Sequence, residues 1–169
     1  MKVARLTISD RASAGVYEDR SGPELEKVLL EILGPGCEFL SAVLPDEPAQ
    51  ISSRLREFAD RDRCALIVTT GGTGITPRDV TPEATRAVLD KELPGFAEAM
   101  RLGSFTKVRT SILSRAVAGI RGSSLIINLP GKPAAIRECL ELIAPAIKEA
   151  LAHLRGEDPH TAQLNTGRS

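Results

Sequence analysis

The chain has 169 residues, of which 42% are hydrophobic and 26% are charged, proportions typical of a globular protein with its own core. Lysine plus arginine and aspartate plus glutamate both count 22, so no net basic field would attract nucleic acid or an anionic membrane surface. No apolar run approaches the roughly 20 residues that a membrane-spanning helix requires. We therefore expect one domain in residues 1–155 and a C-terminal tail in 156–169, with neither nucleic acid nor membrane as a partner.

The cysteines and histidines point to structural rather than catalytic roles. Cys37, Cys64 and Cys139 lie far apart in or beside apolar segments, without the spacing of a zinc site, so we interpret them as buried thiols. An odd count without a signal peptide favours a reducing compartment, and we predict a cytoplasmic protein. His153 and His160 are expected to face solvent, which leaves little support for Ser-His or Cys-His catalysis.

Residues 3–9 are rich in β-forming side chains and predict the first strand. Ser9 and Asp10 would then lie at its carboxyl end, where open α/β sheets bind ligands. The alternative is a surface turn capped by Asp10. A polar loop is expected to follow as far as residue 22, and then a helix over 23–33 that starts with a proline.

Residues 37–44 predict the second strand, and residues 48–60 predict the helix that follows it. Asp46 stands between the two. It could simply cap this helix, because acidic residues are common near helix N-termini. A role in metal binding stays open beside that interpretation.

A glycine-rich turn follows the third predicted strand, residues 65–70. The apolar centre of this strand suits one that is buried on both faces of a parallel sheet. Gly71, Gly72 and Gly74 carry no side chains, so backbone N–H groups of the turn can approach an anion. The turn is neither a Walker A loop nor a dinucleotide fingerprint, because it lacks the lysine of the first and the third glycine of the second.

A helix is predicted over 81–89, with Thr81 as its N-cap, and a strand, a glycine turn and a helix start together favour a phosphate site. Asp46 and Asp79 are separated by about one βαβ unit of roughly 30 residues, so both would project from neighbouring strand ends. Mg²⁺ prefers one or two carboxylates together with substrate phosphates, and this pair could hold it. The alternative for Asp79 is a turn or cap residue.

The remaining segments predict an antiparallel hairpin and two more helices. Strands over 116–120 and 124–128 would form the hairpin, unless a less regular turn separates them. One helix is predicted over 97–105. A long helix over 133–154 follows a second glycine turn, and Pro145 should kink or restart it.

Several motifs together resemble the molybdenum-cofactor biosynthesis family, in particular its single-domain molybdopterin adenylyltransferases, over about residues 3 to 150. They are SDRASAG at 9–15, YEDRSGP at 17–23, LPDE at 44–47, TTGGTGITPRDVTPEAT at 69–85, PGFAEAMR at 94–101 and LSRAVAGIRGSSLIINLPGKP at 113–133. The resemblance implies an α/β fold, a three-layer α/β/α sandwich with a mostly parallel sheet and a short antiparallel hairpin. It also implies a homotrimer and a transient contact with the molybdenum-insertion protein.

The resemblance further implies an activity, in which Mg²⁺ and ATP adenylylate the terminal phosphate of molybdopterin and pyrophosphate is released. Asp46 and Asp79 would be the catalytic and metal-binding acids, and Ser114 would contact the pterin. The other implied contacts to substrate or nucleotide are Ser9 and Asp10 from the first strand end, Gly71, Gly72, Thr73 and Gly74 from the glycine turn, and Asn128, Pro130 and Gly131 from the crevice wall.

Other functions compete with this one. A molybdopterin-binding protein without adenylylation would release no pyrophosphate, and the intact pair of acids argues against it. A trimer that serves mainly as a scaffold is a second alternative. A nicotinamide-dependent dehydrogenase fails because the dinucleotide fingerprint is missing.

Overall fold

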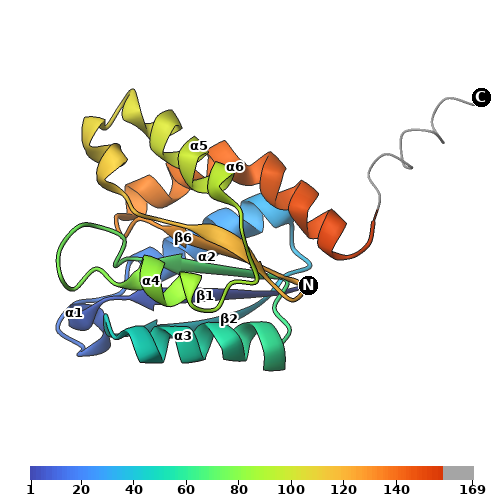
Figure 1. Ribbon diagram of the computed structural model, residues 1–169, viewed down its shortest axis with the longest axis horizontal. Helices are drawn as coiled ribbons and strands as arrows, with labels where there is room; N and C mark the ends of the chain where they lie inside the picture. Colours follow the sequence, from blue (N-terminus) through green and yellow to red (C-terminus); the bar gives the residue numbers. More distant parts are fainter. Residues whose placement is uncertain (158–169) are drawn as a thin grey trace, which may run out of the picture.

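The computed structural model describes residues 1–157, which contain one six-stranded sheet in the order β2-β1-β3-β6-β5-β4 (Figure 1). The strands are β1 (Lys2–Ile8), β2 (Glu38–Leu44), β3 (Leu66–Thr70), β4 (Lys91–Glu92), β5 (Ala118–Arg121) and β6 (Ser124–Leu129). β2, β1, β3 and β6 run parallel, while β5 pairs antiparallel with both β6 and β4. The mostly parallel sheet and the hairpin are confirmed, whereas β4 is an addition that the sequence pattern does not predict.

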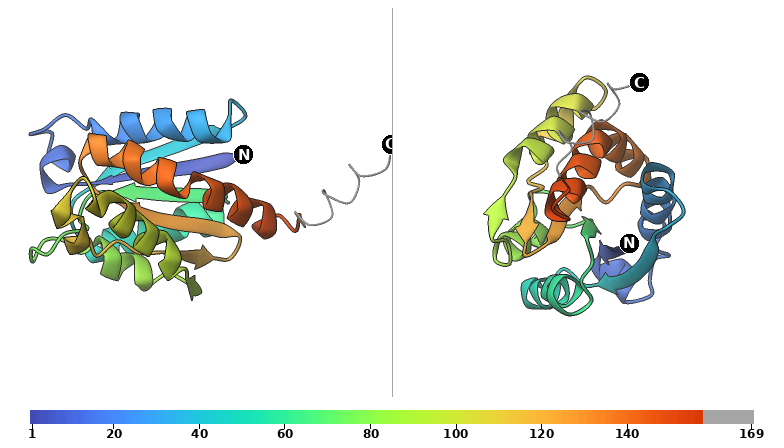
Figure 2. Two further views of the ribbon diagram at one scale, coloured as in Figure 1. Left: turned by 90° about the horizontal axis from the view of Figure 1, so that it is seen from above. Right: turned by 90° about the vertical axis from the view of Figure 1, so that its right-hand side faces the viewer.

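Helices cover both faces of this sheet and complete a three-layer α/β/α sandwich (Figures 1 and 2). The helices are α1 (Asp10–Ser13), α2 (Ser21–Leu33), α3 (Pro48–Arg56), α4 (Thr81–Arg86), α5 (Pro94–Phe105) and α6 (Pro133–Leu154), with a π-helical turn η1 (Glu57–Arg61) and a 3-10 turn η2 (Arg109–Leu113). α2, α5 and α6 pack on one face, and α3, η1 and α4 pack on the other. The predicted fold class is therefore confirmed.

Successive residues of the inner strands belong to different layers of the core, because side chains alternate between the faces of a sheet. In β1, Val3 packs with the α2 and α6 layer, and its neighbour Ala4 packs with the α3 and α4 layer. Every residue of β3 is buried, as expected for a strand that is covered on both faces. The two layers together fix the positions at which the strands end.

The four parallel strands end at the same edge of the sheet. The register pairs Ile8 with Leu44 at the ends of β1 and β2, and Thr70 with Leu129 at the ends of β3 and β6. β1 lies between β2 and β3, so the chain leaves β1 toward one side and returns on its other side. Such a change of direction opens a crevice beyond the strand ends, where α/β proteins bind ligands.

Two predicted details differ in the structure. α6 is one helix through Pro145, so the predicted restart is wrong, while the alternative of a kink stays a prediction. Pro145 is exposed, so the carbonyl group that loses its helical partner can bond to water. The segment after β1 begins with the short helix α1, and its N-cap is Ser9 instead of Asp10, because the hydroxyl of Ser9 accepts the N–H of Ala12 at 3.2 Å.

The cysteines mostly match the prediction. Cys64 and Cys139 are buried, and burial raises the pKa of Cys64 to about 11, whereas Cys37 is only half-buried. The predicted exposure of His153 is confirmed, while His160 and the predicted tail from residue 158 onward lie outside the described residues. Within residues 1–157, no helix combines the length and the apolar character needed to cross a membrane.

The layered core predicts the cost of truncating α2. Leu29 is fully buried, whereas its neighbour Leu30 is 38% exposed. We expect Leu29→Ala to lower the free energy of unfolding by about 2 to 5 kcal/mol, since it removes buried methyl groups and leaves a cavity. Leu30→Ala should cost about 1 kcal/mol or less. Urea denaturation of both variants tests this, and equal losses would contradict the assigned packing of α2.

Candidate functional site

Gly71 and Gly72 turn the chain where β3 ends. Their φ angles are +99° and +62°, in the left-handed region that favours glycine. A Cβ on Gly71 would lie 2.2 Å from the carbonyl oxygen of Ile8, and a Cβ on Gly72 would lie 2.3 Å from Oγ1 of Thr81. The turn therefore packs against the end of β1 and the start of α4 too closely for any larger residue.

Thr81 holds the turn from the α4 side. Its hydroxyl donates to the carbonyl oxygen of Gly71 at 3.0 Å, and its N–H donates to the carbonyl oxygen of Gly72 at 3.1 Å. α4 begins at Thr81 itself and ends at Arg86, so the predicted N-cap role of Thr81 is wrong and the helix is shorter than predicted. The hydroxyl that would have capped the helix fixes the glycine turn.

The turn leaves backbone donors available. The N–H of Gly71 donates to the carbonyl oxygen of Leu129 at 3.2 Å, which ties the turn to the end of β6. The N–H groups of Gly72 and Thr73 donate to no acceptor within residues 1–157. Adjacent free N–H groups in a glycine turn can bind an anion such as a phosphate oxygen. The predicted phosphate cradle at this turn stays a prediction.

Asp10 and Asp46 hold one another by reciprocal hydrogen bonds. The N–H of Asp10 donates to Oδ2 of Asp46, and the N–H of Asp46 donates to Oδ1 of Asp10, each at 3.0 Å. The N-cap of α3 is Glu47, which excludes the alternative that Asp46 caps this helix. Oδ1 of Asp46 lies 2.8 Å from the position of a Cβ on Gly72. The carboxylate of Asp46 is therefore fixed through one oxygen and directed at the glycine turn through the other.

Arg78 neutralises the charge of Asp10. Its Nε and Nη2 donate to the two carboxylate oxygens of Asp10 at 3.0 and 2.9 Å, and Nη2 also donates to Glu47 at 3.0 Å. The hydrogen bonds from Arg78 hold the pKa of Asp10 below its usual value. Asp10 is predicted to contact substrate or nucleotide. In the structure its carboxylate instead pairs with Arg78 and accepts the backbone N–H of Asp46.

Asp79 also lies against the glycine turn. Its Oδ2 accepts the N–H of Thr76 at 2.8 Å and the hydroxyl of Thr76 at 2.6 Å, and it lies 2.9 Å from the position of a Cβ on Gly74. Burial alone would raise the pKa of Asp79, but the hydrogen bonds from Thr76 and Gly74 and the nearby charge of Arg115 together outweigh burial and lower it. Asp79 is thus a turn residue, as its alternative role predicts, and an ionised one at neutral pH.

Asp46 and Asp79 form a negatively charged pair beside the turn. Burial raises the pKa of Asp46, and the charges of Asp10 and Asp79 raise it further, so a cation near the pair would relieve this repulsion. Within residues 1–157, no group of three or more His, Cys, Asp or Glu side chains could hold a metal ion. The pair suits Mg²⁺ only in combination with a ligand that contributes phosphate oxygens.

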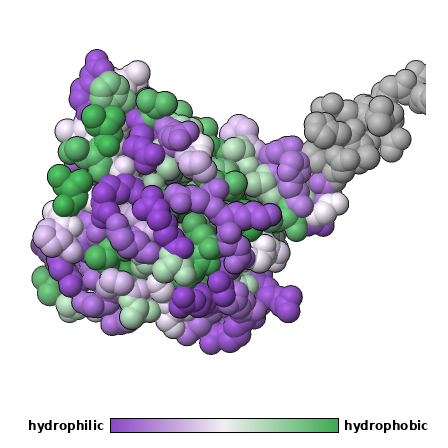
Figure 3. All heavy atoms as spheres, viewed as in Figure 1, coloured by the Kyte–Doolittle hydropathy of each residue, from purple (hydrophilic) through white to green (hydrophobic). Residues whose placement is uncertain are grey.

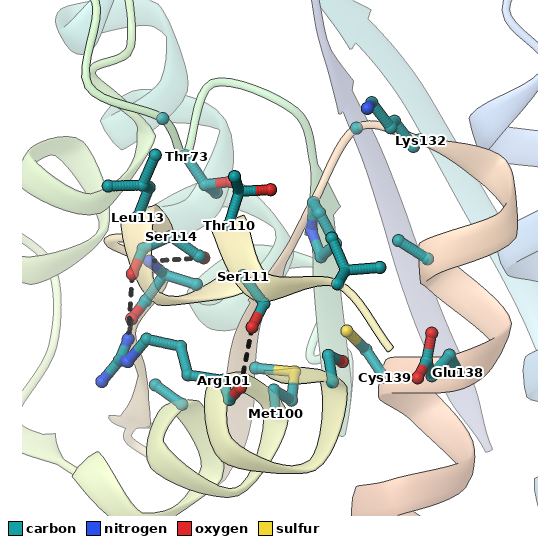
Figure 4. Close-up of a pocket in the computed structure, with 18 of the residues that line it drawn as sticks. Thr73, Met100, Arg101, Thr110, Ser111, Leu113, Ser114, Lys132, Glu138 and Cys139 are labelled. Carbon is teal, nitrogen blue, oxygen red and sulfur yellow. Dashed lines mark hydrogen bonds between the residues drawn. The ribbon is translucent and has the colours of Figure 1, made fainter. Parts of the chain in front are cut away.

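A cavity of about 370 Å³ opens beside the turn, between α5, η2 and the start of α6 (Figure 4). Hydroxyl groups from the turn and from η2 share its walls with apolar side chains, and its volume is that of a small-molecule site. The predicted site residues that line this large cavity are Thr73, Gly74, Ser114, Pro130 and Gly131.

Ser114 is held at the wall of the large cavity by its neighbours. Nη1 of Arg101 donates to the carbonyl oxygens of Ser114 and Ala116 at 3.2 and 3.3 Å, and Ser111 donates to the carbonyl oxygen of Arg101 at 2.9 Å (Figure 4). The hydroxyl of Ser114 accepts the N–H of Ala116 at 3.3 Å. Its own O–H can therefore still donate to a ligand.

A smaller cavity of about 140 Å³ lies beyond the ends of β1 and β3, at the point where the strand order reverses. Ser9 and Gly71 line it, and Gly131 lines both cavities. A Cβ on Gly131 would lie 3.3 Å from Cα of Gly71, so the two glycine turns touch. They form a backbone wall between the two cavities.

Asn128 lines neither of these two cavities, so the structure does not bring it together with the other predicted site residues. The side chain is fully buried, and its Nδ2 donates to the hydroxyls of Thr69 at 3.0 Å and Thr85 at 2.9 Å. Its Oδ1 accepts the N–H of Val117 at 3.3 Å. Asn128 therefore joins β6 to β3, α4 and the segment before β5.

Arg78 and Arg115 are site residues that the sequence analysis missed. Arg115 donates to the carbonyl oxygens of Gly74 and Asp79 and forms an ion pair with Glu83. No sequence motif with a fixed spacing predicts a role for either arginine. Their position in the chain could have suggested one, since Arg78 directly precedes Asp79 in the RDVTPEAT segment and Arg115 directly follows Ser114 in the SRA segment.

Exposed apolar side chains gather over α5 and η2, and two of them, Val108 and Leu113, also line the large cavity (Figure 3). Leu102, Val108, Ile112 and Leu113 lie on or beside α5 and η2, and we call this group the η2 patch. Ile75, on the glycine loop that lines the cavity, is 67% exposed. A contiguous exposed apolar surface of this kind is typical of a binding site or an interface.

The fold and this site define an α/β protein of the kind that binds phosphorylated ligands where parallel strands end. Residues 4–149 match the family model described as "Probable molybdopterin binding domain". This match spans most of the chain, and the chain belongs to the molybdopterin-binding family.

Relatives of known name agree with this assignment. A molybdopterin adenylyltransferase of Helicobacter pylori is 56% identical over 142 residues, which cover 84% of this chain and 81% of the relative. The molybdopterin adenylyltransferase of Escherichia coli is 45% identical over 168 residues, 99% of this chain and 86% of the relative. The crystal structure of the molybdopterin biosynthesis enzyme MoaB from Thermus thermophilus superposes with a TM-score of 0.84 at 45% identity, over 92% of this chain and 97% of that one.

The close contact at Gly71 predicts a strong effect of a single methyl group. We expect Gly71→Ala to lower the free energy of unfolding by about 3 kcal/mol or more, because φ of +99° is strained for alanine and the Cβ would strike the Ile8 carbonyl oxygen. Gly36→Ala is the control, since no atom lies within 4 Å of its Cβ position. Thermal unfolding compares the two, and a Gly71→Ala variant as stable as the control would contradict the described turn.

The burial of Asn128 predicts a structural defect instead of a defect confined to binding. We expect Asn128→Ala to lower the free energy of unfolding by about 2 to 4 kcal/mol, because buried hydrogen-bonding groups lose their partners. Thr85→Val removes one of the same bonds and should cost about half as much. Denaturant titration measures both. An Asn128→Ala variant of unchanged stability that binds molybdopterin more weakly would restore Asn128 to the crevice wall.

Proposed function

We propose that this chain is a molybdopterin adenylyltransferase, which transfers AMP from ATP to the terminal phosphate of molybdopterin in molybdenum cofactor biosynthesis. An oxygen of that phosphate attacks the α-phosphorus of ATP, the bond between the α-phosphorus and the bridging oxygen breaks, and pyrophosphate leaves. Relatives that are 45% and 56% identical over most of the chain carry this name. The family match over residues 4–149 supports the pterin as one substrate.

The observation that carries the proposal is the backbone wall between the two cavities. Gly71 faces the small cavity, whereas Thr73 and Gly74 face the large one, so one turn borders both. A transfer between two substrates needs adjoining sites that bring the reacting atoms together. Gly72 and Thr73 follow Gly71 in the same turn, and their free N–H groups would bind the phosphate chain where it passes from one cavity to the other.

The side chains around the wall then take separate roles. The large cavity, with the hydroxyl of Ser114 in its wall, would hold the pterin. The small cavity is too small for a whole nucleotide and would enclose only part of ATP. Asp46 and Asp79 would hold Mg²⁺ against the phosphates, and their mutual repulsion without a cation supports this assignment. When bound, Mg²⁺ would neutralise charge on the phosphates during transfer.

The wider setting of the reaction also remains a proposal. A homotrimer and a transient contact with the molybdenum-insertion protein rest on the family resemblance, and the η2 patch is a surface that either contact could cover. A cytoplasmic location agrees with the free thiols of Cys37, Cys64 and Cys139, since a reducing compartment keeps thiols unpaired.

The acid pair predicts how activity and binding separate. In a mixture of enzyme, molybdopterin, ATP and Mg²⁺, we expect pyrophosphate release and an adenylylated pterin. Asp46→Asn and Asp79→Asn should each lower the turnover number about 100-fold or more, because a carboxylate that would hold Mg²⁺ against the phosphates is lost. The dissociation constant for molybdopterin should change little, because neither acid lines the large cavity.

Asp60→Asn is the matched control, since Asp60 is exposed and pairs with Arg121 away from the glycine turn. Normal turnover in both Asp46→Asn and Asp79→Asn would overturn the assignment of the acids. Retention of molybdopterin by the wild type without pyrophosphate release would favour the non-catalytic binding protein over the enzyme.

A further inference from the structure

Arg115 connects the wall of the large cavity to the loop that carries Asp79. It directly follows Ser114, and its own N–H donates to the carbonyl oxygen of Thr73 at 2.9 Å. Its side chain then turns away from the cavity, which Ser114 and Ala116 line but Arg115 does not. The residue thus lies between the two parts of the site without facing the ligand space of either.

The guanidinium group bridges both ends of the loop over residues 74–79. Its Nε donates to the carbonyl oxygen of Gly74 and its Nη2 donates to the carbonyl oxygen of Asp79, each at 2.6 Å. Its Nη1 forms an ion pair with Glu83 in the first turn of α4. The loop is therefore closed across its base by one side chain, which is itself anchored to a helix.

These contacts require the shape of arginine as well as its charge. A guanidinium presents its donors as a rigid planar fork, so one edge can reach two carbonyl oxygens while the other end meets a carboxylate. A lysine has a single nitrogen on a flexible stem and cannot hold all three partners at these positions. Since the side chain of Arg115 is 35% exposed, its contacts are partly shielded from water.

We propose that Arg115 is a positioning residue that sets the place of Asp79 relative to the glycine turn and Ser114. It fixes the backbone carbonyl of Asp79 on one side while Thr76 fixes the carboxylate on the other. Its effect on the reaction passes through Asp79, so the catalytic part of this inference rests on the proposed function. The structural part does not.

The test is Arg115→Lys, with Arg121→Lys as the matched control. Arg121 also binds a carboxylate through Nε and Nη2 and a carbonyl oxygen through Nη1, but its partners are Asp60 and Val88, away from the glycine turn. Hydrogen exchange followed by mass spectrometry reports on the N–H groups of Thr76 and Asp79. Both are hydrogen-bonded within the loop.

We expect Arg115→Lys to speed exchange at these two N–H groups by about tenfold, since the bonds that close the loop are lost. Arg121→Lys should leave their exchange unchanged. In the adenylylation assay, Arg115→Lys should lower kcat by about 10- to 100-fold, because Asp79 is misplaced. The KM for molybdopterin should change by less than about threefold, because Arg115 does not line the cavity.

Glu83→Gln provides a second variant that keeps the arginine but weakens its anchor, and it should speed exchange at the same N–H groups to a smaller extent. Loop exchange in Arg115→Lys that equals that of the wild type or of Arg121→Lys would overturn the inference. A wild type without adenylylation would defeat the proposed function alone, because the exchange result would still decide the role of Arg115.

Discussion

The contact between Gly71 and the end of β1 is the constraint on which the rest of the site depends. With no Cβ, β3 can end directly against the carbonyl oxygen of Ile8, and the second glycine turn can touch the first through Gly131. Any side chain at residue 71 would push β3 away from β1. The acids of the β1 and β2 ends would then lie farther from the glycine turn, and the wall between the two cavities would open. The positions of the side chains in the site therefore depend on how closely the backbone packs at this edge of the sheet.

The charges around the turn follow from this packing. Asp10, Asp46 and Asp79 all lie at one edge of the sheet, and carboxylates gathered in a partly buried place raise the cost of ionisation. Arg78 offsets the charge of Asp10, and hydrogen bonds from Thr76 stabilise that of Asp79. Asp46 is left with a raised pKa. Such an arrangement costs stability, and groups whose pKa is shifted in this way are typical of functional sites, which agrees with the site that we propose.

The sequence predicted the parts of the fold that depend on local patterns. The continuous apolar run of β3 and the helical period of α6 each come from neighbouring residues, and both are present. β4 has only two residues and exists because it pairs with β5, so no local pattern could reveal it. Only the predicted restart at Pro145 was wrong, because a proline on an exposed helix face is tolerated when water replaces the lost bond.

The candidate site divides in the same way. The glycine turn was predictable, since missing side chains and a following helix start are visible in the sequence. The role of Asn128 was not, because an asparagine near the end of a strand, just before a glycine turn, suits either a ligand or a buried hydrogen-bond network. Only the positions of Thr69, Thr85 and Val117 decide between the two. Arg115 likewise meets Gly74 and Asp79 from 41 and 36 residues away along the chain.

The wall between the cavities is made of backbone, which makes it more rigid than a wall of side chains. A side chain between two ligands could rotate among rotamers, whereas this turn is bonded to Leu129, to Thr81 and, through its loop, to Arg115. Its free N–H groups are therefore held in place before any ligand arrives, and little reorganisation is needed when charge develops nearby. Because the reaction that we propose requires two anionic groups to meet in line, a rigid boundary with donors would help to align them before the side chains beside it act.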